Sequence, residues 1–173
     1  HGACAGDVDA DGYADIVAGA PDGLTGSTRN GRISLHCGTA GTIDPGGVRH
    51  VALRACGAVS GEDDGDRFGV AVATSGDVDG DGFSDIIVGA PLAEGTLFPD
   101  EGRAFSFLGS PDGLHAQGLW AASGDARAGE ALATAGNLDG DGLDDVVIGA
   151  PDAFGEGEVR VYYGQGGYGL LQS

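Results

Sequence analysis

Aspartate side chains recur along a nine-residue stretch, Asp77-Val-Asp-Gly-Asp-Gly-Phe-Ser-Asp85. They occupy positions 1, 3, 5 and 9, and Gly82 at position 6 permits a sharp reversal of the chain. Oxygen donors at this spacing are what a hard cation such as Ca²⁺ requires. The stretch therefore predicts a calcium-binding loop, whereas the alternative for an isolated acidic loop is a solvated turn.

Nearly the same loop occurs twice more, from Asp7 to Asp15 and from Asn137 to Asp145. Each copy runs into a short apolar segment that ends in Gly-Ala-Pro, and the loops start 70 and 60 residues apart. Three copies at full ligand spacing favour calcium over a solvated turn. A repeat of this size indicates stacked supersecondary units, and we expect one repeat domain with blades at 1–56, 57–123 and 124–173.

Two other calcium motifs, the EF-hand and the dockerin loop, place a helix after the loop and an acidic residue at position 12. Here position 12 is Ala18, Val88 or Ile148, each inside apolar sequence typical of a strand. The loops therefore fit strand hairpins. A structural role for the metal is favoured over signalling or catalysis, because protein groups fill every ligand position.

The segments that must position these loops have the composition of β-strands. They are short, rich in Val and Ile, and bounded by Gly, Pro and Asp, and none shows the longer periodicity of a helix. The continuous apolar runs 86–88 and 146–148 predict strands that are buried on both faces. Four-stranded antiparallel units covered on both faces must stack on copies of themselves, so we predict an all-β fold of propeller blades. In the most complete unit the expected strands are 68–75, 85–91, 102–108 and 114–122.

Composition narrows the classes of function. The net charge of -19 argues against nucleic acid or an anionic membrane as a partner, and 41% hydrophobic residues are enough for a core. No apolar run approaches the roughly 20 residues of a membrane helix. The chain contains no methionine and begins within a repeat, so we expect it to be a piece of a longer protein.

Cys4, Cys37 and Cys56 permit one disulfide of unassigned pairing if the protein is secreted. The alternative is that these cysteines are small buried residues in strands.

Phe68-Gly69, followed by the loop from Asp77 to Asp85 and by Gly89-Ala90-Pro91, resembles the FG-GAP repeat of integrin alpha-subunit β-propellers and their bacterial relatives. The resemblance covers almost the whole chain as three repeats. It implies four-stranded antiparallel blades with calcium in the hairpin between the first and second strands. Carried over by position, it implies three Ca²⁺ sites, with side-chain ligands and the carbonyl of residue 7 of each loop: Asp7, Asp9, Asp11, Asp15 and Tyr13; Asp77, Asp79, Asp81, Asp85 and Phe83; Asn137, Asp139, Asp141, Asp145 and Leu143.

This sequence departs from the family pattern at two positions and in the number of blades. Ala128 stands where the second unit has Phe68, and Asn137 replaces a carboxylate, so the third site is expected to be the weakest. Family propellers close with about seven blades. A fragment of a larger propeller is therefore the favoured interpretation and assembly of copies into a ring the second. An open arc is disfavoured because exposed apolar surface costs about 25 cal/mol per Å².

The resemblance implies a non-enzymatic, extracellular module for adhesion or for recognition of a protein or glycan ligand, with calcium in a structural role. Its recognition face lies opposite the calcium hairpins, on the segments 21–30, 91–101, 151–156, 57–67 and 123–127. Two alternatives remain: a non-catalytic accessory part of a secreted hydrolase, and a purely architectural oligomeric propeller. The acidic run from Glu62 to Asp66 is the candidate for catalytic carboxylates, although a solvated connection is the favoured interpretation.

Overall fold

The computed structural model describes residues 1–43, 45–47, 49–94, 100–121, 127–166 and 169–172, and for 49–51, 116–121 and 169–172 it describes the backbone alone. Within these residues the chain forms three four-stranded antiparallel sheets, and the strands of each sheet pair in chain order. Blade 1 contains β1 (Gly2–Gly6), β2 (Asp15–Ala20), β3 (Arg32–Ile43) and β4 (Arg49–Ser60). Blade 2 contains β5 (Val72–Gly76), β6 (Asp85–Ala90), β7 (Arg103–Leu108) and β8 (His115–Ala121). Blade 3 contains β9 (Ala131–Gly136), β10 (Asp145–Ala150), β11 (Glu158–Gln165) and β12 (Gly169–Gln172).

The predicted all-β architecture of three four-stranded blades is confirmed. The one helical element among the described residues is the 3₁₀ turn η1 (Ala153–Gly155), and no described helix has the length and apolar character to cross a membrane. Strand β4 continues to Ser60, past the boundary at residue 56 that the sequence suggested. The expected strand end at Ala122 lies outside the described residues.

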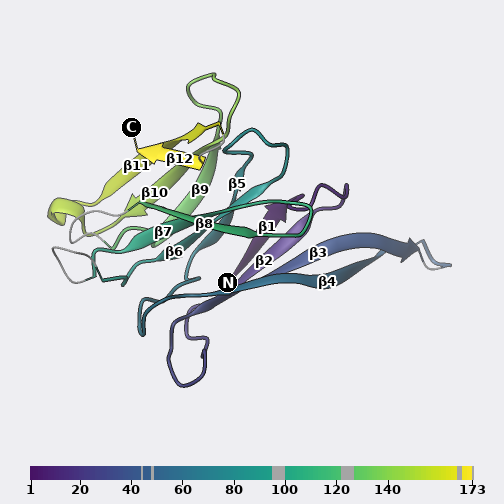
Figure 1. Cartoon of the computed structure of the whole chain (residues 1–173), viewed down its shortest axis with the longest axis horizontal. Coiled ribbons are helices and arrows are strands. Elements are labelled where there is room, and N and C mark those ends of the chain that lie inside the picture. The colour runs from purple at the N-terminus through teal and green to yellow at the C-terminus, as the bar shows by residue number, and fades with distance from the viewer. Residues whose placement is uncertain (44, 48, 95–99, 122–126, 167–168, 173) are drawn as a thin grey trace.

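The blades stack with their first strands side by side. Strand β5 lies against β1 on one side and against β9 on the other, whereas β4, β8 and β12 are the outermost strands of their sheets (Figure 1). This arrangement matches blades packed around a common axis. It also places every hairpin between a first and a second strand near that axis.

Apolar side chains fill both spaces between the blades. All six residues of β6 are buried, because its alternate side chains face opposite neighbours: Ile86 and Val88 pack with blade 1, and Ile87 packs with blade 3. The prediction that the continuous apolar runs are buried on both faces is confirmed for β6. Each such Val or Ile contributes about 1.5–3 kcal/mol when it is fully buried.

Glycines allow the blades to approach closely at each junction. A Cβ atom added to Gly19 would lie 2.0 Å from the carbonyl oxygen of Gly69, and one added to Gly89 would lie 1.9 Å from that of Gly129. The glycines of the first two Gly-Ala-Pro segments therefore touch the backbone of the next blade's opening segment. No side chain fits there.

The phenylalanine of the repeat motif is present where blade 2 meets blade 1, but an alanine replaces it where blade 3 meets blade 2. Phe68 is buried and packs edge to face with Phe105 and Phe107, at ring-centroid distances of 5.5 and 6.1 Å. Ala128, at the same position of blade 3, is buried in a small cluster with Ala150 and Ala153. The expected absence of an aromatic anchor in blade 3 therefore corresponds to a compact cluster of alanines.

The outer face of blade 3 has no neighbour within the chain. Val8 and Val78, at loop position 2 of blades 1 and 2, are fully buried beneath the following blade, but Leu138 at the same position is 55% exposed. On the third strands, Ile33 is likewise buried whereas Val159 is 70% exposed. Gly149 lines a cavity of about 540 Å³ on this face. Apolar positions that are core in blades 1 and 2 are thus surface in blade 3.

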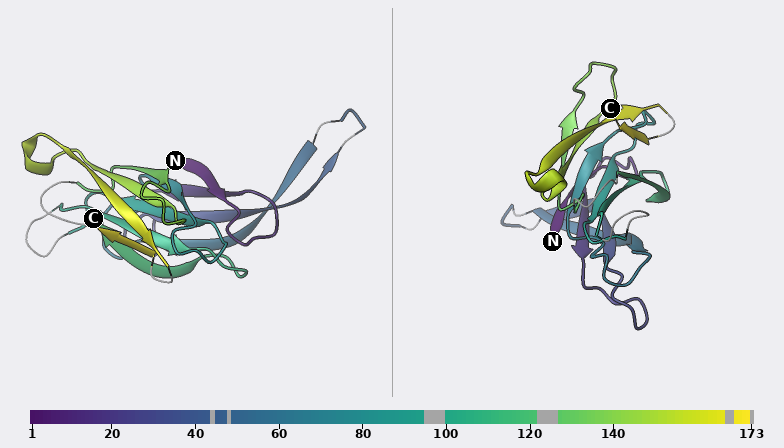
Figure 2. Two further views of the ribbon diagram at one scale, coloured as in Figure 1. Left: turned by 90° about the horizontal axis from the view of Figure 1, so that it is seen from above. Right: turned by 90° about the vertical axis from the view of Figure 1, so that its left-hand side faces the viewer.

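A long two-stranded ribbon extends from blade 1. Strands β3 and β4 have 12 residues each, whereas β7 has 6, and the ribbon projects well beyond the stacked sheets (Figure 2). A disulfide between Cys37 and Cys56 joins the two strands, and Cys4 is an exposed free thiol. Closing a loop across a sequence separation of 19 residues stabilises the fold by about 3 kcal/mol, mainly through the unfolded chain.

Candidate metal centres

Each acidic loop joins the first and second strands of its blade, where the resemblance places calcium. The loops follow β1, β5 and β9 and precede β2, β6 and β10, and Figure 1 shows the three of them along one edge of the molecule. The connections from second to third strands lie at the opposite end of the sheets. The stack of blades thus places the three loops next to one another.

Hydrogen bonds to the loop backbone hold the carboxylates at positions 1 and 5. Asp77 accepts from the backbone N–H groups of Gly80, Asp81 and Gly82 at 2.7–3.1 Å, and Asp81 accepts from that of Phe83 at 3.0 Å. Equivalent bonds to Asp7, Asp11, Asn137 and Asp141 shape the other loops. Such short-range bonds from acidic side chains fold the turn locally.

The aspartate at position 9 joins its loop to the third strand or, in blade 2, to the residue that directly follows that strand. Asp85 is fully buried, and its two oxygens accept from the backbone N–H groups of Val78 and Gly109, both at 2.8 Å. Asp15 accepts in the same way from Val8 and Gly38. Asp145 accepts from Leu138 and Gly164. The sequence predicted these residues only as metal ligands, and the bond to a strand about 20 residues later was missed because no local pattern shows it.

Two of the loops bring carboxylates together at ligand distances. One oxygen each of Asp7, Asp9 and Asp11 lies within 4.8 Å of the others, and the same holds for Asp77, Asp79 and Asp85. Asp9 is buried, and its Oδ1 atom has no hydrogen-bond partner. A buried carboxylate oxygen without a partner is costly unless a cation or water meets it. The donor set is all oxygen and therefore suits Ca²⁺.

The third loop differs from the other two. Asn137, Asp139 and Asp141 are exposed, and among the described residues the three carboxylates of this loop, those of Asp139, Asp141 and Asp145, do not come together within the same distance. Asp145 is buried at the base of the loop. The individual ligand assignments, including the carbonyls of Tyr13, Phe83 and Leu143, stay predictions.

Neighbouring loops are bonded to each other through position 8. Ser84 Oγ accepts from the backbone N–H of Asp7 at 3.1 Å, and the Ser84 N–H donates to the Asp7 carbonyl at 3.0 Å. Asp144 makes the same pair of bonds with the backbone of Asp77. Position 8 of loops 2 and 3 is thus hydrogen-bonded to the backbone of the first residue of the preceding loop.

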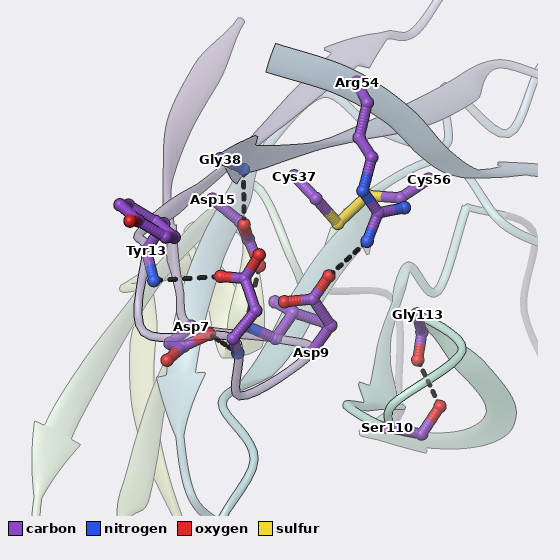
Figure 3. Close-up of a disulfide and its surroundings, with 12 residues drawn as sticks. Asp7, Asp9, Tyr13, Asp15, Cys37, Gly38, Arg54, Cys56, Ser110 and Gly113 are labelled. Carbon is purple, nitrogen blue, oxygen red and sulfur yellow. Dashed lines mark hydrogen bonds and ion pairs between the residues drawn. A yellow bond between two sulfur atoms is a disulfide. The ribbon is translucent and has the colours of Figure 1, made fainter. Parts of the chain in front are cut away.

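An arginine from the projecting ribbon enters the first loop. Arg54 on β4 donates to Asp9 Oδ2 at 2.6 Å, next to the Cys37–Cys56 disulfide (Figure 3). These two residues are 45 positions apart. Sequence reasoning missed this contact because it depends on which residue of β4 faces the loop.

Burial raises the pKa of several loop carboxyls. It raises the pKa of Asp85 to about 7 and outweighs the two N–H bonds that favour the charged form. It also raises the pKa of Asp9 and Asp79, with repulsion from Asp11 and Asp81 respectively as the next cause. In the metal-free protein these carboxyls therefore keep their protons to a higher pH than an ordinary aspartate does.

In a chelator, the melting temperature is expected to fall by a few degrees or more as the pH rises from 4 to 8. The folded state keeps protons on these carboxyls after the unfolded chain, with a pKa of about 3.9, has lost them. The contribution of these protonated carboxyls to the stability of the folded state is thus complete below the pKa of the unfolded chain. It is lost as the pH rises through about 7, the pKa of Asp85 in the folded state. The carboxyls of Asp152, which is exposed, and Glu158, which is partly buried, have pKa values lowered by hydrogen bonds from arginines, and they weakly oppose this loss of stability.

With excess calcium the trend should reverse over the same range, because protons compete with the cation for the carboxylates. Thermal melts in chelator and in calcium provide the check. A chelated protein whose melting temperature climbs steadily from pH 4 to 8 would contradict the expectation.

The acidic connection between blades 1 and 2 contains one buried carboxyl. Asp66 is buried, and burial raises its pKa, with Asp63 as the second cause. Asp64 accepts from the backbone N–H of Arg29 at 2.7 Å. Neither the cavity on blade 3 nor a cavity of about 490 Å³ on blade 1 is lined by residues of this run.

Comparison with known proteins agrees with the motif. A family model described as FG-GAP repeat matches residues 1–36, 68–98 and 128–166, which is more than half of the chain. Integrin alpha-4 of Xenopus laevis is 36% identical over 110 residues, which cover 61% of this chain and 10% of the relative. Integrin alpha-PS3 of Drosophila melanogaster is 33% identical over 159 residues, 85% of this chain and 13% of the relative. Integrin alpha-5 of Xenopus laevis is 32% identical over 167 residues, 92% of this chain and 15% of the relative. The chain thus spans 10–15% of the length of these relatives.

Proposed function

The chain belongs to the FG-GAP repeat family, and from this membership we propose that it is a calcium-stabilised, integrin-like propeller module. It recognises a protein or glycan ligand outside the cell and catalyses no reaction. Calcium is structural in this proposal, and the ligand binds at the end of the blades opposite the acidic loops.

The buried, unpartnered Oδ1 of Asp9 is the observation that supports a cation in the loops. Asp7, Asp9, Asp11 and Asp15 would hold it in blade 1, and the aspartates of the second and third loops would hold the others together with Asn137. When bound, the cation neutralises carboxylates that otherwise repel one another. Protein oxygens supply the ligands, so the cation would fasten the two strands of each hairpin together.

An extracellular location is supported by the disulfide between Cys37 and Cys56, because disulfides persist in oxidising compartments. Exposed loop sites of this kind bind calcium weakly, and extracellular calcium is abundant enough to fill weak sites.

Exposed apolar side chains on the loops opposite the acidic edge support ligand recognition. Phe154 is 91% exposed and has a left-handed backbone with φ of 54°, and Leu24 in the matching loop of blade 1 is 62% exposed. The matching residue of blade 2, Glu94, is also exposed although blade 3 follows it. The exposure of Phe154 is therefore a property of this loop position. Large exposed aromatic side chains are common anchors in protein and glycan interfaces.

The Phe154→Ala variant is expected to reduce ligand binding at least tenfold without changing the melting temperature. The measurement is binding of the calcium-loaded protein to an immobilised panel of glycans and purified extracellular matrix proteins. Ile43→Ala is the matched control, because Ile43 is 61% exposed but lies on the projecting ribbon. Equal losses for the two variants would argue against a recognition surface on the Phe154 loop.

We also propose that the open face of blade 3 receives a further blade, from a longer chain or from a second copy. Leu138, Val159 and Gly149 stand where blades 1 and 2 have residues covered by a neighbour. Light scattering of the isolated chain separates the two sources, since a defined multimer indicates copies and a monomer indicates a longer chain.

A second candidate function is catalysis as part of a secreted hydrolase, and the buried carboxyl of Asp66 is the observation that favours it. Perturbed carboxyls occur in active sites as well as in structural networks. Hydrolysis of a polysaccharide, with turnover lost in Asp66→Asn, would support this candidate over the binding module.

A further inference from the structure

The first acidic loop already contains a positive charge. Arg54 donates to Asp9 Oδ2 at 2.6 Å, and the Asp9 side chain is only 3% exposed. The other oxygen of the same carboxylate, Oδ1, is the buried atom without a partner. The Asp9 carboxylate thus has one oxygen bonded to Arg54 and one buried oxygen without a hydrogen-bond partner.

The fold of blade 1 places Arg54 on the side of the ribbon that faces the first acidic loop. Residues opposite each other in an antiparallel pair lie on the same face, and Arg54 pairs with Cys37. The Cys37 sulfur lies within 4.8 Å of oxygens of Asp9 and Asp15, so this face points toward the loop. Arg54 therefore shares the loop-facing side of the ribbon with Cys37.

A bulge and the disulfide fix the register that brings Arg54 there. Leu35 pairs with Gly57 but the next residue, His36, pairs with Ala55, so Cys56 is an extra residue without a paired partner. Cys56 is also the residue bonded to Cys37 (Figure 3). Bulges redirect side chains, and the disulfide holds this one in place.

The ion pairs of the described residues include no equivalent contact in the second or third loop. The strand position that corresponds to Arg54 in blade 2 is His115, which pairs with Leu108 and is exposed. Within the structure as described, the guanidinium contact distinguishes loop 1 from its two repeats.

We propose that Arg54 is a built-in competitor for the cation of loop 1, so that this loop binds a divalent cation more weakly than loop 2 and exchanges it more readily. The proposal rests on the proposed calcium function. A guanidinium has donors only and cannot share a carboxylate lone pair with a metal. Calcium must displace Arg54 from Oδ2 or bind beside a positive charge, and either route weakens binding. The Arg54 side chain is 53% exposed, so it can leave for solvent.

Tyr13 allows loop 1 to be observed separately. It is the aromatic residue at position 7 of this loop, where loops 2 and 3 have Phe83 and Leu143. Tb³⁺ replaces Ca²⁺ at oxygen sites and emits when a nearby tyrosine is excited. The emission that disappears in Tyr13→Phe therefore reports Tb³⁺ in loop 1. Titration with Tb³⁺, followed by competition with Ca²⁺, measures the affinity of that loop for both ions.

Arg54→Ala is expected to tighten loop 1 at least tenfold, which corresponds to the loss of one charge-assisted hydrogen bond that competes with the metal. Arg54→Lys, which keeps the charge, should change it much less. Arg127→Ala is the control for net charge, because Arg127 pairs with Glu130 and Asp152 away from loop 1. Calorimetry of the same variants gives the total number of sites without relying on emission.

The outcomes separate the two proposals. If Tb³⁺ and Ca²⁺ bind nowhere, the calcium function fails. If they bind but Arg54→Ala leaves loop 1 unchanged or weaker, or if Arg127→Ala tightens it equally, the competitor role fails. If Arg54→Ala does not fold, Arg54→Gln, which removes the charge but keeps part of the aliphatic stem and one donor group, is titrated in its place with the same expected direction.

Discussion

Replacing Gly89 by alanine is expected to lower the free energy of unfolding by about 3 kcal/mol or more. The new Cβ atom would lie 1.9 Å from the carbonyl oxygen of Gly129 and 2.9 Å from its carbonyl carbon. These are backbone atoms of the next blade and cannot turn aside as a flexible side chain would. Blades 2 and 3 would have to separate, which exposes part of the cluster around Val78, Ile87 and Val146. Chemical denaturation of the calcium-loaded protein measures the loss.

Gly149→Ala is the matched control, since Gly149 occupies the same position of the Gly-Ala-Pro segment in blade 3. Its Cβ would lie 3.3 Å from the Cβ atom of Ala131 and 3.6 Å from the Ala131 carbonyl oxygen, both in the same blade. We expect a change within about 1 kcal/mol. If a second copy covers blade 3 through the same junction, this variant should instead reduce the mass seen in light scattering. Equal and small effects of both substitutions would contradict the junction described for Gly89.

Removing calcium is expected to lower the melting temperature by about 10 °C or more. Each site filled at 100 times its dissociation constant stabilises the folded state by about 2.7 kcal/mol, and for a chain of this length each kcal/mol shifts the melting temperature by roughly 2–4 °C. Without the cation, the carboxylates clustered in loops 1 and 2 repel one another. Differential scanning calorimetry in excess calcium and then in chelator gives the shift directly.

Asp79→Asn should remove part of this shift because it takes a carboxylate from the loop 2 cluster. Asp112→Asn changes the net charge equally at an exposed position outside the loops and should leave the shift intact. A melting temperature that is the same in calcium and in chelator would overturn the structural role of the metal. The third loop, with Asn137 at position 1 and exposed carboxylates, is expected to contribute least.

Much of the fold could be predicted from the residues along the chain. The acidic loops fall between the first and second strands as expected, since each loop needs only nine consecutive residues and the flanking apolar runs mark the strands. The double burial of β6 followed from its continuous Ile and Val residues. The structure brings Asp77, Asp79 and Asp85 together, but the metal itself and the individual ligands stay predictions.

The amino-acid sequence by itself determined the repeats, the strand order within each blade and the positions of the acidic loops, because these depend on residues close together in the chain. Only the tertiary structure decided that Cys37 pairs with Cys56, that Arg54 reaches Asp9, and that Asp85 bonds to Gly109. It also decided that Val78 is core whereas Leu138 is surface. These contacts depend on strand register, on a single bulge and on which blade lies next to which, and no local pattern of residue types encodes them.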